Sequence, residues 1–136
     1  MDKYIEAALP LAEINRAAMR ERAGKAGHPA NLHMWWGRSR VASSLAVLAA
    51  ALLDYSEDTV AADLELIARA ASGDANGLGA VRSRLSELGE LPTVWDPFAG
   101  FGGIPFAAQK LGLRAAASDL NPVAATLTRA AVDIPA

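Results

Sequence analysis

Cysteine is absent from the 136 residues of this sequence, which excludes disulfide bonds and thiolate metal sites. Long apolar runs are also absent. The longest, Leu45 to Leu53, is far shorter than the roughly 20 residues that a membrane-spanning helix needs. The first residues include Asp2 and Glu6 and lack the uninterrupted apolar segment of a secretory signal. We therefore expect a cytoplasmic protein that does not associate with membranes.

Patterns that carry common enzyme chemistry are also missing. The two histidines, His28 and His33, lie five residues apart without a nearby carboxylate ligand set, so we expect no metal site. There is no Gly-Lys-Ser/Thr phosphate-binding pattern, and no grouping of serine, histidine and aspartate indicates a nucleophilic triad. The sequence therefore gives no indication of P-loop or serine-hydrolase chemistry.

The charged residues are unevenly distributed. Residues 1–40 hold seven basic and four acidic residues, whereas residues 41–136 hold six basic and eleven acidic ones. A basic N-terminal segment on an acidic body could attract phosphate groups. The alternative is a helix face that carries its charges in solvent, and the sequence leaves both open.

The hydrophobic pattern predicts one domain-sized chain with a helical region, 1–92, followed by alternating strands and helices in 93–136. In the first region it predicts helices at 10–26 and 38–53, one capped by Ser56 and reaching Ala71, and one from Leu78 to near Gly89. In the second it predicts a short strand ending at Asp96, a helix at 104–111, a strand at 113–119, and a helix from Pro122 to Val132. This order is typical of an α/β protein with a parallel sheet.

Two short parallel strands are not a stable sheet by themselves, because parallel sheets are covered on both faces and usually have several strands. Both predicted strands would keep open edges. We therefore expect the remaining strands to come from a longer polypeptide or from a second chain.

The most informative motif is Asp96-Pro-Phe-Ala-Gly-Phe-Gly-Gly103, which follows a predicted strand and precedes a predicted helix. Gly100 and Gly102 allow a sharp turn and a close approach of the backbone to a ligand at the helix N-terminus. The charge of Asp96 disfavours a phosphate and favours a cationic group, so the motif indicates S-adenosyl-L-methionine rather than a dinucleotide. The alternative is a strand-to-helix turn that only packs tightly.

A second motif, Ser118-Asp-Leu-Asn-Pro122, lies about twenty residues further on, where the next predicted strand ends. Asp119 at this place can accept hydrogen bonds from both ribose hydroxyls of an adenosine. Its alternative role is to cap the helix that follows.

Residues 28–40 form a third cluster, in which Trp35 and Trp36 stand beside Arg38 and Arg40. These side chains could stack on bases or bind a carboxylate or phosphate. Alternatively, the tryptophans anchor the N-terminal helices to the domain while the arginines face water.

These motifs resemble those of one enzyme family. The chain is similar to the N-terminal part of the large adenine-specific DNA methylases that begin with a DUF1156 domain, a branch of the class I amino-methyltransferases. The resemblance covers most of residues 4–132 and is weakest across 54–92. It rests on Ile5-Glu-Ala-Ala-Leu-Pro10, Glu13-Ile-Asn15, Leu32-His-Met-Trp-Trp-Gly-Arg38, the glycine motif at 96–103, and Ala117-Ser-Asp-Leu-Asn-Pro-Val-Ala124.

The resemblance implies a Rossmann-like fold that binds S-adenosyl-L-methionine and transfers its methyl group to the N6 atom of adenine in DNA. It implies that the methionine side of the cofactor contacts Asp96, Pro97, Phe98, Ala99, Gly100 and Gly102. It likewise implies that the ribose side contacts Asp119, Leu120 and Asn121. His28 and Arg38 match the segment that precedes the cofactor motif in related enzymes and contacts the methionine end.

The family's catalytic Asp-Pro-Pro-Tyr motif, or a relative such as Asn-Pro-Pro-Phe, does not occur in this sequence. In the family that motif hydrogen-bonds the adenine amine and stacks on the flipped base. We therefore expect little or no methyltransferase activity from this chain alone, and adenine methylation of DNA by the purified chain would contradict this. Two alternatives remain: a non-catalytic helical scaffold, or a methyltransferase for RNA, protein or a small molecule.

Overall fold

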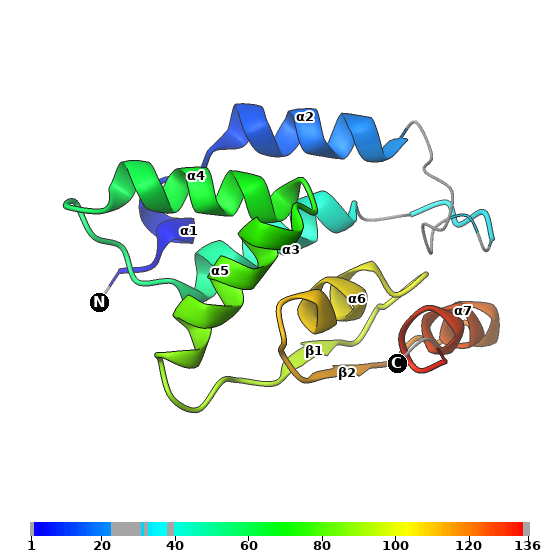
Figure 1. The fold of residues 1–136 in the computed structure, drawn as a ribbon. Coiled ribbons are helices and arrows are strands. Elements are labelled where there is room, and N and C mark those ends of the chain that lie inside the picture. Colours follow the sequence, from blue (N-terminus) through cyan, green and yellow to red (C-terminus); the bar gives the residue numbers. More distant parts are fainter. Residues whose placement is uncertain (1, 23–30, 32, 38–39, 135–136) are drawn as a thin grey trace.

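The computed structural model describes residues 2–22, 31, 33–37 and 40–134 and shows a mixed α/β architecture that is mostly helical (Figure 1). Helices α2, α4 and α3 are stacked above α6, and two short strands lie below α6. The helices are α1 (Tyr4–Ala7), α2 (Leu11–Arg22), α3 (Val41–Leu52), α4 (Val60–Ala71), α5 (Ala75–Ser86), α6 (Gly103–Lys110) and α7 (Pro122–Val132). The strands are β1 (Val94–Asp96) and β2 (Ala115–Ala117).

Helix α3 is at the centre of the fold. It packs against α1, α2, α4 and α6, and its Leu45, Ala46, Ala49 and Ala50 are buried. A helix with neighbours on several sides needs no broad polar face, which explains the long run of alanine and leucine in its sequence. The expectation of a helix within 38–53 is confirmed, and the helix is largely buried.

Hydrogen bonds and an ion pair connect the start of α1 to the segment after α3, about fifty residues further along the chain. Tyr4 is fully buried, and the Nζ of Lys3 donates to the Leu52 carbonyl at 2.8 Å and to the Asp54 carboxylate at 2.6 Å. The Tyr55 N–H donates to the Asp2 carbonyl at 2.8 Å. The hydrophobic pattern did not predict α1, because four residues are too few to establish a helical period.

Asp63 is a buried carboxylate that joins three helices. Its Oδ2 accepts from the hydroxyls of Thr59 (2.6 Å) and Tyr4 (2.7 Å), and its Oδ1 accepts from an Arg84 guanidinium nitrogen at 2.7 Å. Burial acts to raise the pKa of Asp63, but these hydrogen bonds and the charge of Arg84 together outweigh burial and lower the pKa below its ordinary value. One ionised side chain therefore fastens α1 and α5 to α4.

Glu21, in the last turn of α2, caps α3. Its two carboxylate oxygens accept from the backbone N–H groups of Val41 (3.1 Å) and Ala42 (2.9 Å). The first N–H groups of a helix have no partner within the helix and form its positive end, so a carboxylate there stabilises it. The end of α2 is thereby fixed to the start of α3.

Helices α4 and α5 meet at a tight junction. The Asp74 side chain caps α5 by accepting from the Gly77 N–H at 2.8 Å. A Cβ atom on Gly77 would lie 2.7 Å from the Arg69 Cβ and 2.9 Å from the Arg69 carbonyl carbon, so the two helices touch at this point. The predicted start of this helix at Leu78 was therefore too late, because this cap and this contact begin the helix at Ala75.

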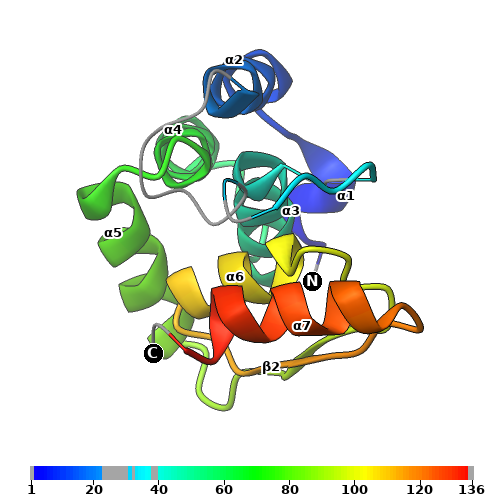
Figure 2. The same cartoon turned by 90° about the vertical axis from the view of Figure 1, so that its right-hand side faces the viewer.

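Strands β1 and β2 pair in parallel, with Trp95 opposite Ala116, and α6 connects them. Figure 2 shows α7 lying beside α6 and β2. Val94 and Ala115 pack against the hydrophobic core on the side of α6. The expected strand–helix–strand–helix order and the parallel pairing are therefore confirmed, although β2 is shorter than the predicted 113–119.

The opposite face of this sheet is bare within the part of the chain that the structure describes. Trp95 points away from the core, its side chain is 71% exposed, and its partner Ala116 is also exposed. No helix lies below the strands in Figure 1. A parallel sheet with one uncovered face and two open edges is consistent with the expectation that further strands complete it.

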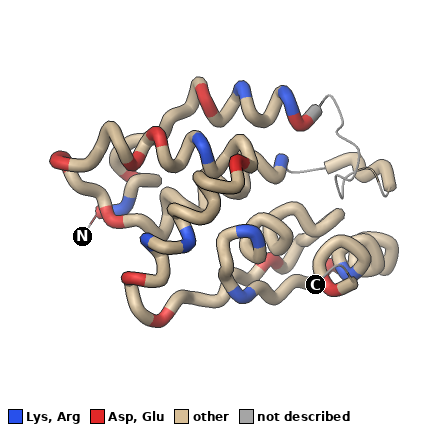
Figure 3. Tube along the Cα trace, viewed as in Figure 1, with Lys and Arg blue, Asp and Glu red and all other residues tan. Residues whose placement is uncertain are grey.

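The surface charges are mixed. Along α2, red acidic positions flank blue basic ones (Figure 3), so this helix presents no uniformly basic face where the structure describes it. The predicted basic character of 1–40 thus does not become a basic patch on α2. Among the described helices, none is both long enough and apolar enough to cross a membrane.

Candidate functional site

The glycine turn, residues 97–102, connects β1 to α6. Gly100 and Gly102 have φ angles of 58° and 87°, a region that favours glycine, and Gly102 is the N-cap of α6. Asp96, at the end of β1, is 7% exposed, and its Oδ1 accepts from the Phe98 N–H at 3.1 Å. The sharp turn that the glycine pattern predicted is therefore present.

Asp119 lies directly against the glycine turn. Its Oδ2 accepts from the Gly100 N–H at 2.8 Å, and its Oδ1 accepts from the Asn121 N–H at 2.9 Å. These two hydrogen bonds lower the pKa of Asp119 below its ordinary value, which keeps the carboxylate ionised at neutral pH. The two motifs that the sequence places about twenty residues apart thus meet at the carboxyl ends of neighbouring parallel strands.

Of the remaining residues of the second motif, some shape the start of α7 and one is exposed to solvent. Asn121 is the N-cap of α7, because its side chain accepts from the Val123 N–H at 2.9 Å, and Pro122 occupies the first position of that helix. The capping role considered for Asp119 therefore belongs to Asn121. Leu120, between them, is 99% exposed.

Two side chains that the motifs did not indicate also contact the glycine turn. The Thr128 hydroxyl on α7 donates to the Gly100 carbonyl at 3.2 Å, and a Cβ on Gly102 would lie 3.1 Å from the Thr128 Cα. A Cβ on Gly100 would lie 2.8 Å from Nε1 of Trp35. Both contacts depend on how distant segments pack, so no local sequence signal could reveal them.

The two adjacent tryptophans have different surroundings. Trp35 is half-buried and packs against the core, which agrees with the anchoring role considered for it. Trp36 is 91% exposed, so it does not anchor the N-terminal helices, although its ring centroid lies 6.3 Å from that of Trp35.

Exposed apolar side chains flank the carboxylates of the site. Phe98 is 86% exposed, and Leu120 is almost completely so. Single exposed hydrophobic residues are ordinary on protein surfaces. Here Phe98 lies two residues before Gly100 and Leu120 directly follows Asp119, so both add apolar surface near the site for a flat or aliphatic ligand group.

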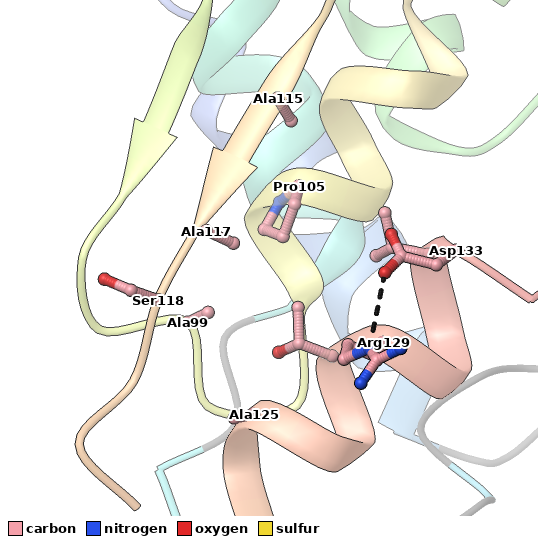
Figure 4. Close-up of a pocket in the computed structure, with 10 residues that line it drawn as sticks. Ala99, Pro105, Ala115, Ala117, Ser118, Ala125, Arg129 and Asp133 are labelled. Atoms are coloured by element: carbon pink, nitrogen blue, oxygen red, sulfur yellow. Dashed lines mark ion pairs between the residues drawn. The ribbon is translucent and has the colours of Figure 1, made fainter. Parts of the chain in front are cut away.

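A cavity of about 180 Å³ opens beside the turn, between β2, α6 and α7 (Figure 4). Its lining includes Ala99 and Ser118, as well as Arg129 of α7 and Asp133, the C-cap of that helix, which form an ion pair at 3.8 Å. Drug-sized ligands occupy pockets of roughly 300–1,000 Å³, so this cavity is too small for a whole nucleoside cofactor. Neither Phe98, Asp119 nor Leu120 lines it.

The other predicted site residues are placed as follows. Ala99 is buried and its N–H donates to the Ser118 carbonyl at 3.0 Å, which continues the pairing of the two strands into the turn. Pro97 is exposed at the start of the turn. His28 and Arg38 lie outside the residues that the structure describes. In the described ranges, no group of three or more histidine, aspartate or glutamate side chains could hold a metal ion.

The match to a known family covers the N-terminal region of this mixed α/β chain. Residues 8–71 match the family described as "Protein of unknown function (DUF1156)". The resemblance to DUF1156 is thus confirmed for this region, which runs from the end of α1 to the end of α4 and does not include the glycine turn. No curated protein and no solved structure matches the chain.

Proposed function

We propose that this chain is the S-adenosyl-L-methionine-binding part of a DNA adenine-N6 methyltransferase, inactive by itself. The observation that carries the proposal is the hydrogen bond between Asp119 and Gly100. It puts an ionised carboxylate beside a glycine turn at the carboxyl ends of parallel strands. Open α/β sheets bind nucleotide-like ligands at that edge, and an acidic residue there can hold the ribose.

The residues at the turn fit the chemical groups of this cofactor. Asp96 and Asp119 are carboxylates, which suit a ligand that carries an ammonium and a sulfonium. Phe98 and Leu120 offer exposed apolar surface to an adenine ring. Each oxygen of Asp119 has a lone pair beyond its backbone hydrogen bond, and these can accept ribose hydroxyls.

In this proposal the protein supplies position and charge. A bound cofactor would supply an electrophilic methyl group, and Asp96 and Asp119 would hold its ammonium and its ribose. The Thr128 and Trp35 contacts keep the turn in one conformation, so the binding groups are preorganised. The Asp-Pro-Pro-Tyr-type motif that would hold the adenine amine does not occur in this sequence.

The proposal also includes a Rossmann-like sheet that is completed by another segment or chain. Its support is the exposed Trp95 and the open edges of β1 and β2. DNA would be the substrate of that complete enzyme.

A second candidate is a non-catalytic scaffold, and specific contacts favour it. The space that a side chain on Gly100 or Gly102 would need is filled by Trp35 or Thr128. Both oxygens of Asp119 already bind the backbone. The turn therefore has a packing reason for its glycines even without a ligand.

Calorimetric titration with S-adenosyl-L-methionine separates the two candidates. We expect saturable binding by the 136-residue chain that is about tenfold to hundredfold weaker in Asp119→Asn, because an amide replaces the charged acceptor of the ribose hydroxyls. Asp58→Asn, an exposed position in the α3–α4 connection, is the matched control and should bind as the wild type does. A folded wild-type chain that does not bind the cofactor would favour the scaffold.

A further inference from the structure

Trp35 presents the nitrogen-bearing edge of its indole ring to the glycine turn. From a Cβ placed on Gly100, the nearest atoms are Nε1 at 2.8 Å and Cδ1 at 3.3 Å, both on that edge. Gly100 has no side chain, so the indole edge approaches the turn backbone closely. The N-terminal helical region thereby contributes a polar group to the edge of the sheet where Asp119 lies.

The indole N–H forms no hydrogen bond with any acceptor in the described part of the chain. The indole nitrogen is not fully buried, so its N–H can meet water or a ligand. The backbone groups of Gly100 already have other partners, because its N–H donates to Asp119 and its carbonyl accepts from Thr128. The donor is thus available to a ligand beside the turn.

The charged side chains of the site supply the opposite chemistry. Asp96 and Asp119 are carboxylates and only accept hydrogen bonds when ionised. A ligand with both an ammonium and a carboxylate, as the methionine group of S-adenosyl-L-methionine has, needs a donor for its carboxylate oxygens. Trp35 brings such a donor close to Gly100.

We infer, on the basis of the proposed function, that the Trp35 N–H binds the carboxylate of the methionine group and so selects an amino-acid-bearing nucleoside over one that lacks this carboxylate. Tryptophan donates through this single N–H and carries no charge. Its contribution is therefore specific to an acceptor placed at the turn, whereas a surface lysine would attract any anion.

The test compares S-adenosyl-L-methionine with its decarboxylated analogue, in which the same chain ends in the amine alone. We expect Trp35→Phe to weaken binding of S-adenosyl-L-methionine about tenfold or more and to change binding of the analogue less than about twofold, because phenylalanine keeps the apolar packing and loses only the donor. Trp36→Phe is the matched control: that neighbouring side chain is 91% exposed and should affect neither ligand.

Each result is decisive. Equal losses of affinity for both ligands in Trp35→Phe would show that Trp35 contributes only packing, and this would overturn the inference. No loss of affinity for either ligand would overturn it as well. In both cases the proposed function would stand. Failure of the folded wild-type chain to bind either ligand would overturn the proposed function itself.

If Trp35→Phe does not fold, the double variant Trp36→Phe/Trp95→Phe leaves Trp35 as the sole tryptophan of the three. Its fluorescence should then respond to S-adenosyl-L-methionine more than to the analogue, and equal responses would overturn the inference.

Discussion

Replacing Asp63 with alanine is expected to lower the free energy of unfolding by about 3 kcal/mol, because it removes one partner from a buried charged network. The hydroxyls of Tyr4 and Thr59 lose their common acceptor, and Arg84 loses its ion pair. Arg84 is 40% exposed and regains water, which keeps the loss from being larger. Urea unfolding of the two proteins measures the difference.

Glu65→Ala is the control for this experiment, since Glu65 is an exposed acidic residue on the same helix. It should change stability by less than about 0.5 kcal/mol. A similar small change for Asp63→Ala would show that the network contributes little.

The pH dependence of stability provides a second measurement of the same network. The folded-state pKa of Asp63 is lower than its unfolded value of about 3.9, so the unfolded chain binds the proton more readily. The stabilisation is complete above the unfolded pKa and is lost as the pH falls towards the folded pKa. The wild type should therefore lose its advantage over Asp63→Ala below about pH 4.

Gly77→Ala is expected to destabilise the protein by about 2 kcal/mol, because the added methyl group has no room between α4 and α5. The nearest atoms belong to the Cβ and backbone of Arg69 and to the Ala70 nitrogen, so no flexible side chain can move aside. Thermal or urea unfolding tests this expectation.

Gly79→Ala is a control with the opposite expected sign. Gly79 lies two residues further along the same helix, and a Cβ there meets nothing within 4 Å. Alanine reduces the conformational entropy of the unfolded chain and is the better helix former, so this variant should be more stable by about 0.5–1 kcal/mol. Equal effects of the two substitutions would contradict a close contact at Gly77.

Local sequence patterns predicted the main elements because those elements have a clear period or a recognised turn. The long helices, the parallel strand pair and the positive φ angles at Gly100 and Gly102 all follow from such patterns. The start of α4 was wrong: Ser56 was predicted as the cap, but the N-cap is Thr59, whose hydroxyl donates to Asp63. The predicted helix end near Gly89 was also too late, because α5 ends at Ser86, and Leu88 beyond it is 44% exposed.

The features that were not predicted depend on contacts between distant segments. From the sequence alone, an aspartate such as Asp63 is expected at the surface. Its burial follows from the hydrogen bonds that it accepts from Tyr4 and Arg84, which are distant in sequence. Similarly, nothing near Trp35 in the sequence indicates that it contacts Gly100 while Trp36 remains exposed. The sequence did place Asp119 at the end of the second parallel strand, but its hydrogen bond to Gly100 was not predicted.

The cap that Glu21 provides to α3 bears on how this chain can change in length during evolution. Its bonds to Val41 and Ala42 hold together the two ends of the intervening sequence, whatever that sequence contains. Joining the ends of a chain segment makes its closure cost only weakly dependent on its length, at about 0.6 kcal/mol for each doubling. The packing of α2 on α3 should therefore tolerate changes in the length of the sequence between them.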